Sequence, residues 1–207
     1  PSDAVCWDYN APDAVPGVIG GVRFSPMTIE ADLAGPINYA KRVVGGWGAS
    51  HKAAMREQFG RVLSIGGIGE SLPNPRSNVD LDVESKDAHG IPKARIHSYL
   101  PETEIQRLAF IAKICREALS AAGVERPIEE FGSYDMFNAT HVFGTCRMGN
   151  DPETSVVDEF CRSHRWRNLL VTDASIFPSS GGGEAPSLSI YANSLRAAHY
   201  IKQQGVH

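Results

Sequence analysis

Residues 168–173 constrain the fold more than any other stretch of the chain. The run NLLVT is mostly apolar, and Asp173 follows it directly. Such a run is typical of an inner strand of a parallel sheet. Open α/β sheets bind ligands at the carboxyl ends of their strands, where Asp173 would lie. We therefore expect an α/β fold whose binding edge includes this carboxylate.

A glycine-rich loop and a helix follow this strand. Three glycines lead to Pro186, a residue suited to the first turn of a helix. With Pro186 first, the cap position falls on Ala185, whose side chain cannot accept the first N–H groups. Those donors are then free for an anionic or electron-rich ligand, such as a reduced flavin ring. An ordinary glycine turn before a surface helix is the alternative. The helix keeps one apolar face, made by Leu188, Tyr191, Ala192, Leu195 and Ala198.

The segment HVFGTCRMG, residues 141–149, holds an imidazole and a thiol close together. If the segment is extended, His141 and Cys146 point to opposite faces, which disfavours a nucleophile–base pair. A zinc site with Cys161 and His164 as further ligands is a second possibility, although the spacing of the first two residues is unusual. The remaining interpretations are His141 as a lone catalytic base, or as a structural residue in a tight turn.

The upstream half predicts a mixture of strands and helices. Alternating residues predict strands within 18–29 and 61–69, and glycine-interrupted helix formers predict two short helices within 39–59. The runs SNVDLDVE and KARIHSYL alternate polar and apolar residues around Gly90 and Pro92, which predicts a paired-strand hairpin.

Residues 103–122 form the best-defined helix. Thr103 and Gln106 match a capping box, and Gly123 suits a left-handed stop. Cys115 falls on the apolar stripe, so we expect it in the core. The stripe consists of Ile105, Leu108, Ala112, Cys115, Leu119 and Ala122.

The overall composition excludes several classes of protein. A net charge of −4 argues against nucleic acid as the main partner. No apolar run is long enough to span a bilayer, and the first residues do not resemble a signal peptide, so we expect a soluble protein, cytoplasmic or periplasmic. The four cysteines are too irregular for a disulfide framework. The start at Pro1, without methionine, is typical of a processed or truncated chain.

Three ordered motifs in the last third of the chain resemble one known family. HVFGTCRMGNDPETSVVD, NLLVTDASIFPSSGG and APSLSIYANSLRAAHYI are together similar to the C-terminal signature of the glucose–methanol–choline (GMC) oxidoreductases, flavoenzymes that oxidise alcohols. A looser similarity to the family's substrate-binding region covers residues 77–108. The resemblance implies a substrate domain with an antiparallel sheet in residues 1–135. Residues 136–207 would be the closing segment of a Rossmann-like FAD domain.

The resemblance also implies roles for individual residues. His141 falls where the family has its active-site histidine, which accepts the substrate hydroxyl proton while a hydride passes to the flavin. Many members carry a second histidine or asparagine at the position of Ala185, and Glu184 next to it is a candidate replacement. The alternatives are that His141 acts alone or with a residue outside these motifs; Asn193, two turns into the helix, is a weaker candidate. The implied FAD contacts are Asp173 and Ala174 near the ribityl and phosphate region, and Pro186, Ser187 and Leu188 at the isoalloxazine ring.

One family element is missing from this sequence. The strand, G-x-G-x-x-G turn and helix that hold the FAD pyrophosphate do not occur, and GGIGESL at 66–72 lacks the last glycine. We therefore expect the C-terminal part of an enzyme that needs an N-terminal FAD-binding half as partner. Its substrate would be a sugar or small alcohol, and its electron acceptor is open. The alternative is a stand-alone binding module of the same fold, marked by an extensive apolar edge at 169–172.

Overall fold

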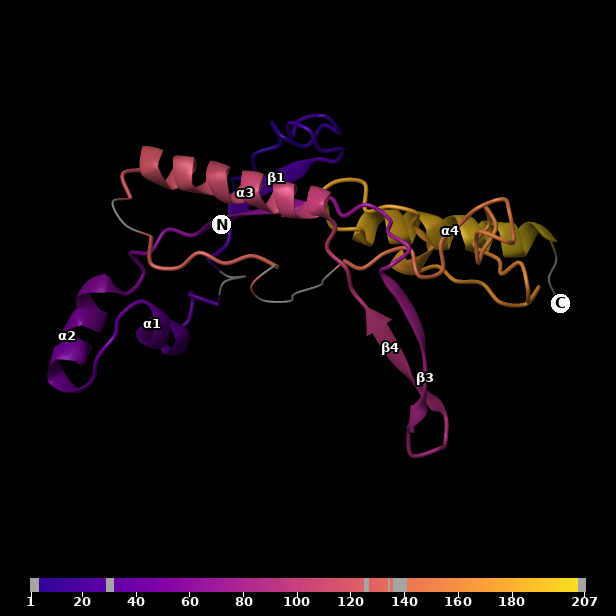
Figure 1. Cartoon of the computed structure of the whole chain (residues 1–207), viewed down its shortest axis with the longest axis horizontal. Helices are drawn as coiled ribbons and strands as arrows, with labels where there is room; N and C mark the ends of the chain where they lie inside the picture. Colours follow the sequence, from indigo (N-terminus) through magenta and orange to yellow (C-terminus); the bar gives the residue numbers. More distant parts are fainter. Residues whose placement is uncertain (1–3, 29–31, 125–126, 134, 136–140, 205–207) are drawn as a thin grey trace. The chain divides into compact units, whose positions relative to one another are not determined.

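The computed structural model describes residues 4–28, 32–124, 127–133, 135 and 141–204 (Figure 1). In this part of the chain, four α-helices and two small antiparallel sheets form a mixed α/β structure. This agrees with the general fold class expected from the sequence.

Two compact units divide the chain, and neither is continuous in sequence. Unit 1 consists of Pro1–Gly69 and Ile105–Phe137, and unit 2 consists of Glu70–Glu104 and Asn138–His207. Residues 70–104 thus group with the carboxyl-terminal segment. The expected division into residues 1–135 and 136–207 concerns the domains of a complete enzyme, and it stays a prediction.

A two-stranded sheet and helix α3 form the centre of unit 1. Strand β1 (Val22–Pro26) pairs antiparallel with β2 (Ile65–Gly69), and both lie within the predicted runs. Ile29, at the end of the first run, lies outside the described residues. The glycines of β2 allow α3 to approach closely, since a Cβ at Gly67 would lie 2.7 Å from the side chain of Ile111.

Helix α3 (Glu102–Ala121) begins one residue earlier than the sequence predicts. Thr103 therefore lies inside the first turn, so it is not the cap and the predicted capping box is wrong. Glu102 and Glu104 place negative charge in the first turn, where the helix dipole favours it.

The carboxyl end of α3 is as predicted. Gly123 has φ +82°, and its N–H donates to the Ser120 carbonyl at 3.0 Å. The N–H of Val124 donates to the Leu119 carbonyl at 3.0 Å. These two bonds make a Schellman motif, which needs a left-handed residue at Gly123.

The buried face of α3 is offset by one position from the expected stripe. Its buried residues are Glu104, Arg107 and Ile111, and Arg107 donates to the Ile19 carbonyl. Cys115 packs at the edge of the core as predicted, and burial raises the pKa of its thiol to about 11. The core around Ile111 consists of Val15, Val18, Val22 and Phe24.

Two short helices lie between β1 and β2, as predicted, although the first begins three residues before the predicted region of 39–59. They are α1 (Pro36–Arg42) and α2 (Gly48–Gln58). Tyr39 of α1 is buried, and its hydroxyl donates to the Gln58 carbonyl at the end of α2. Its ring lies 5.0 Å from that of Phe59, so Tyr39 holds the two helices together.

The predicted hairpin is present in unit 2. Strands β3 (Asn78–Lys86) and β4 (Pro92–His97) pair antiparallel, and Gly90 in their connection has φ +80°. One face carries charged pairs such as Asp80 opposite Arg95. The other face is apolar and open, and its exposed residues include Val79, Leu81 and Ile96.

Asp80 is the centre of the charged face. The Arg95 guanidinium donates two hydrogen bonds of 2.8 Å to its carboxylate, and His97 Nε2 lies 3.2 Å from Oδ2. The Arg95 hydrogen bonds are the main cause that lowers the pKa of Asp80 to about 2, and His97 adds to the effect.

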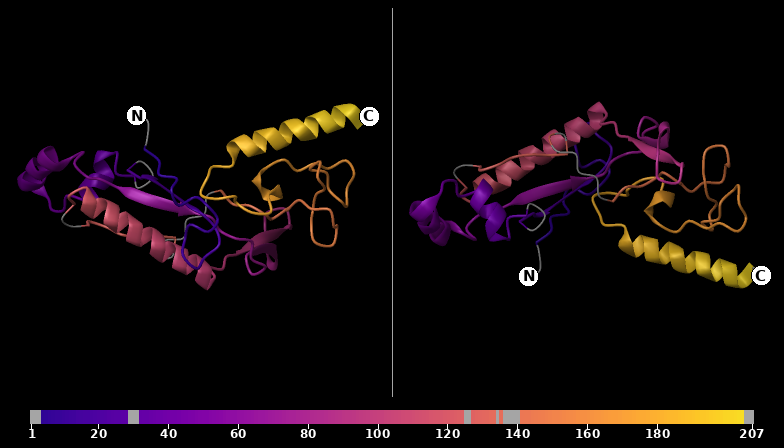
Figure 2. Two further views of the ribbon diagram at one scale, coloured as in Figure 1. Left: turned by 90° about the horizontal axis from the view of Figure 1, so that it is seen from above. Right: turned by 90° about the horizontal axis from the view of Figure 1, so that it is seen from below.

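Helix α4 (Ser187–Gln204) lies beside the irregular chain of residues 146–177 in unit 2 (Figure 2). Ala197 is its buried residue, and Ser194 Oγ donates to the Ile190 carbonyl at 2.9 Å and lies 3.4 Å from the Thr172 carbonyl. The small core against which Ala197 packs consists of Val157, Cys161 and Ile176, all fully buried.

The expected parallel strand at residues 169–172 is wrong for the described part of the chain. Leu170 makes a single antiparallel bridge with Arg162, and the Val171 N–H donates to the Cys161 carbonyl at 2.9 Å. A parallel strand needs a neighbouring strand of the same direction. None of the described segments supplies one there.

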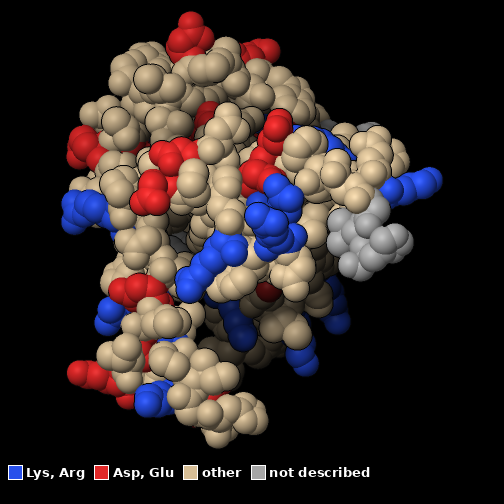
Figure 3. All heavy atoms as spheres, turned by 90° about the vertical axis from the view of Figure 1, so that its right-hand side faces the viewer, with Lys and Arg blue, Asp and Glu red and all other residues tan. Residues whose placement is uncertain are grey.

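The surface carries both signs of charge. On the face seen in Figure 3, Lys and Arg side chains are interspersed with Asp and Glu, with uncharged residues between them. Among the described helices, none is long and apolar enough to cross a membrane.

Candidate active site

Two short segments that the sequence analysis identified as candidate site segments, residues 141–149 and the turn after Asp173, lie side by side in unit 2. The N–H of Cys146 donates to the Ser175 carbonyl at 2.9 Å, and the N–H of Met148 donates to the Ile176 carbonyl at 2.8 Å. The segment that begins with His141 is thereby fastened to the turn that follows Asp173.

His141 is exposed and has a left-handed backbone conformation, with φ +56°. Residues with a Cβ adopt this conformation rarely, and it recurs at functional sites. Its imidazole has no hydrogen-bond or charged partner among the described residues, so both ring nitrogens are available to a ligand. Gly144, with φ +83°, turns the chain between His141 and the bonded residues.

Asp173 caps a 3-10 turn formed by Ala174–Ile176. Its Oδ1 accepts from the Ser175 N–H at 2.8 Å, and the turn closes with the Phe177 N–H donating to the Ala174 carbonyl at 3.2 Å. The carboxylate is exposed, and Oδ2 has no hydrogen-bond partner in the described part of the chain. One oxygen therefore shapes the turn while the other can accept from a ligand.

Residues 178–185 connect this turn to α4. Gly181 and Gly182 have positive φ angles of +66° and +102°. A residue with a Cβ would be strained in this conformation. Gly182 and Gly183 are buried, Glu184 is half-buried, and Ala185 is exposed. We call residues 178–185 the glycine loop.

Helix α4 begins one residue later than expected. The Pro186 carbonyl accepts from the Ile190 N–H at 2.9 Å, so Pro186 takes the cap position in place of Ala185. Proline has no side-chain acceptor either, so the physical consequence is the same. The N–H groups of Ser187 and Leu188 have no acceptor among the described residues, and both side chains are exposed.

Residues 73–194 match the family model described as GMC oxidoreductase, over more than half of the chain. The chain belongs to the GMC oxidoreductases. The matched region is the C-terminal region of these enzymes.

Several characterised GMC relatives are similar to this chain. A 2-methyl-1,2-propanediol dehydrogenase of Mycolicibacterium austroafricanum is 35% identical over 162 residues, covering 78% of this chain and 29% of the relative. A paromamine 6'-oxidase of Streptomyces fradiae is 36% identical over 140 residues, covering 67% and 25%. A gluconate 2-dehydrogenase flavoprotein of Pantoea cypripedii is 27% identical over 206 residues, covering 95% and 33%. The chain spans a third or less of the length of these relatives.

One contact of the glycine loop pairs two residues for which the sequence predicted no role. The Ser179 hydroxyl donates to Glu70 Oε1 at 2.7 Å, in a partly buried position. The two residues are 109 positions apart, and although Ser179 lies in NLLVTDASIFPSSGG and Glu70 in GGIGESL, the sequence assigned neither a role. Sequence patterns carry no signal for such a contact.

The zinc alternative has no support in the described residues of this GMC chain. They contain no group of three or more His, Cys, Asp or Glu side chains arranged to hold a metal. His164 instead bonds the loop before it, with Nε2 2.9 Å from Ser155 Oγ and 3.1 Å from the Gly149 carbonyl. Cys161 is fully buried, and burial raises the pKa of its thiol.

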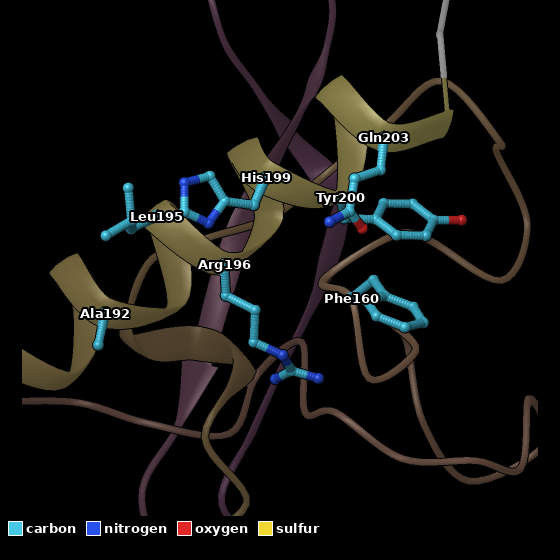
Figure 4. A pocket seen from close by; sticks show the side chains of 7 residues that line it. All are labelled: Phe160, Ala192, Leu195, Arg196, His199, Tyr200 and Gln203. Carbon is cyan, nitrogen blue, oxygen red and sulfur yellow. The ribbon is translucent and has the colours of Figure 1, made fainter.

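The apolar face of α4 occurs as predicted, but it is exposed. Leu188, Tyr191 and Leu195 are 81%, 73% and 60% exposed. A cavity of about 370 Å³ opens beside this face, next to the stacked rings of Phe160 and Tyr200, whose centroids are 4.2 Å apart (Figure 4).

The apolar surface that would mark a stand-alone module is small at its expected place. Leu169 is 43% exposed, whereas Leu170 and Val171 pack against the core of unit 2. In unit 2 of this GMC chain, α4 and the hairpin carry more exposed apolar side chains than residues 169–172 do.

Proposed function

We propose that this chain is the C-terminal part of an FAD-dependent GMC enzyme that oxidises an alcohol, with His141 as the catalytic base. The observation that carries the proposal is the bonding of Cys146 and Met148 to Ser175 and Ile176, which joins the His141 segment to the Asp173 turn. The relatives are named for 2-methyl-1,2-propanediol, paromamine and gluconate, which supports a CH–OH donor, either a sugar or a small alcohol.

His141 receives the proton of the substrate hydroxyl at one of its ring nitrogens. Imidazole suits this role because histidine is the side chain that most often serves as a general base in enzymes. Its strained φ of +56° fixes the side chain's origin, and the bonds at Cys146 and Met148 hold the segment behind it. FAD, when bound, supplies the acceptor for the hydride that leaves the carbinol carbon.

The residues around the start of α4 fit a flat, electron-rich ring. The N–H groups of Ser187 and Leu188, together with the positive end of the helix dipole, favour negative charge on such a ring. The exposed Leu188 side chain and Pro186 offer apolar contact. The free Oδ2 of Asp173 suits a ribityl hydroxyl donor, with Ala174 beside it.

Glu184 is the proposed second polar group of the site. Ala185, at the position where many members carry histidine or asparagine, can neither donate nor accept through its side chain. The half-buried Glu184 is adjacent in sequence and carries a carboxylate that can accept a proton or a hydrogen bond.

The N-terminal FAD-binding half of the same enzyme is the proposed partner. The relatives are at least three times longer than the stretches they share with this chain, so most of each relative is additional protein. Exposed apolar side chains on α4 and on the hairpin, such as Leu195 and Leu81, are surfaces that further protein would cover.

A visible absorption spectrum together with the intact masses of the purified preparation tests this proposal. We expect a flavin spectrum only when the FAD-binding half accompanies this chain, as one longer polypeptide or as a second one. We also expect the flavin to be reduced when an alcohol or sugar is added without oxygen. A complete enzyme that carries no flavin would contradict the proposal and favour the stand-alone module.

A further inference from the structure

We infer that Glu70 is a positioning residue whose carboxylate holds the glycine loop in place through Ser179. The inference rests on the proposed function, because the loop leads directly to the helix terminus assigned to the flavin ring. Glu70 itself is not proposed to touch substrate or cofactor. It acts through the shape of the loop.

The contact is of a strong kind. The Ser179 hydroxyl donates to Glu70 Oε1 at 2.7 Å, in a partly buried position. Hydrogen bonds to an ionised acceptor are about twice as strong as neutral ones, and partial burial limits competition from water.

Glu70 is well placed to act as an anchor. It directly follows Gly69, the last residue of β2. Two residues further on, the Leu72 N–H donates to Oε1 of Glu104 at 3.3 Å, and Glu104 is itself buried. Within unit 2, the Leu72–Glu104 bond therefore restrains the chain next to Glu70.

The glycine loop needs such an anchor. Gly181 and Gly182 adopt left-handed conformations, and glycines lose the most backbone freedom when they are ordered. No backbone N–H of residues 178–185 donates to a backbone carbonyl in the described part of the chain. The conformation of the glycine loop therefore depends largely on side-chain contacts.

The Glu70–Ser179 bond also restrains the neighbouring residue Ser180. The Oγ of Ser180 is buried and has no hydrogen-bond partner among the described residues. A buried donor without a partner is costly unless a ligand satisfies it. Without the Glu70 contact, the Ser180 hydroxyl would be free to turn out of its buried position. The start of α4 at Ser187 would then also be free to shift.

The test uses the full-length enzyme that contains this chain, with bound FAD. The variants are Glu70→Ala, Ser179→Ala, the double variant, and Glu70→Gln, which keeps an acceptor oxygen. Glu153→Ala, an exposed acid in the same unit, is the matched control. The readouts are the FAD dissociation constant, the visible circular dichroism of the bound flavin, and kcat and KM for the alcohol.

We expect Glu70→Ala and Ser179→Ala each to weaken FAD binding about tenfold, with the double variant no weaker than either single one, because both remove the same bond. We also expect an altered flavin dichroism and a lower kcat at nearly unchanged KM. Glu70→Gln should stay within about threefold of the parent, since its amide oxygen still accepts. Glu153→Ala should match the parent.

Two results would overturn the inference by different routes. If the parent binds and reduces FAD but Glu70→Ala and Ser179→Ala keep its affinity and dichroism, Glu70 has no positioning role, even if the variants melt at lower temperature. Additive effects in the double variant would do the same. A parent without FAD would overturn the proposed function, and this inference with it.

Discussion

The backbone N–H of Cys146 lies 2.9 Å from the carbonyl oxygen of Ser175, and this bond joins the two conspicuous motifs of the chain. On one side of it is the strained, exposed His141, and on the other is the turn capped by Asp173. The geometry of the proposed site depends on this junction. A change that disturbs it should therefore affect catalysis more than it affects the fold.

Gly144→Ala tests the junction. Gly144 has φ +83°, and a Cβ there would meet only the Phe177 carbonyl, at an ordinary 3.5 Å. The cost is therefore backbone strain, about 1 kcal/mol of unfolding free energy. Because the strain lies between His141 and Cys146, we expect alcohol-dependent flavin reduction to slow about tenfold or more.

Gly90→Ala is the control for that experiment. Gly90 has nearly the same φ, +80°, with open space around it in the hairpin connection. It should lose a similar amount of stability, measured by denaturant unfolding, and keep its rate of flavin reduction. Equal rate losses in the two variants would contradict a special role for the junction.

Glu184→Gln tests the second proposed polar group. The amide keeps the size of the side chain but cannot take up a proton. We expect flavin reduction to slow about tenfold while FAD stays bound. Glu159→Gln, an exposed acid of unit 2, serves as the control. A rate equal to that of the parent would remove Glu184 from the site.

Alkylation tests the burial of Cys115 and Cys161. The thiolate is the reactive form, and burial raises the pKa of Cys115 to about 11 and also raises that of the buried Cys161. We expect iodoacetamide near neutral pH to leave both unmodified in the folded protein and to modify both after unfolding. Peptide mass spectrometry follows each site. Rapid labelling of Cys161 in the folded protein would contradict the described core.

The hairpin should lose a stabilising interaction in acid. The Arg95 hydrogen bonds, with a smaller part from His97, hold the pKa of Asp80 at about 2, against about 3.9 in an unfolded chain. Since the folded value is the lower one, the stabilisation is complete above about pH 4 and disappears as the pH falls through 2.

Thermal melting of Asp80→Asn over this pH range measures the effect. The parent should melt higher than the variant near neutral pH, and the two should converge below about pH 2. Glu84→Gln, whose side chain has no partner among the described residues, should show no such convergence. A constant difference between parent and Asp80→Asn would contradict the assigned ion pair.

Local signals predicted the features that depend on local physics. The alternation around Gly90 predicted the hairpin, and Gly123 predicted the Schellman end of α3, because turn and cap conformations are set by neighbouring residues. The cap predicted at Thr103 was wrong by two residues, and the cap predicted at Ala185 by one. The energetic difference between adjacent cap positions is small.

Sequence patterns did not predict the features that depend on residues far apart in the chain. Nothing local predicts that Arg107 is buried with its guanidinium on the Ile19 carbonyl, or that Ser179 bonds Glu70. The run ending at Thr172 predicted an inner strand because its residues suit one, yet a strand needs neighbours that the described chain lacks. The apolar face of α4 was predicted from the sequence, but its exposure to solvent was not.

The proposed role of His141 is to take the substrate proton during alcohol oxidation by a flavin enzyme. The rate at which an alcohol reduces the bound flavin in a single turnover without oxygen measures this role, in the full-length parent and in His141→Ala. We expect a rate about 10²–10⁴-fold lower in the variant, with FAD still bound and its spectrum unchanged. An unchanged rate would remove His141 from the mechanism.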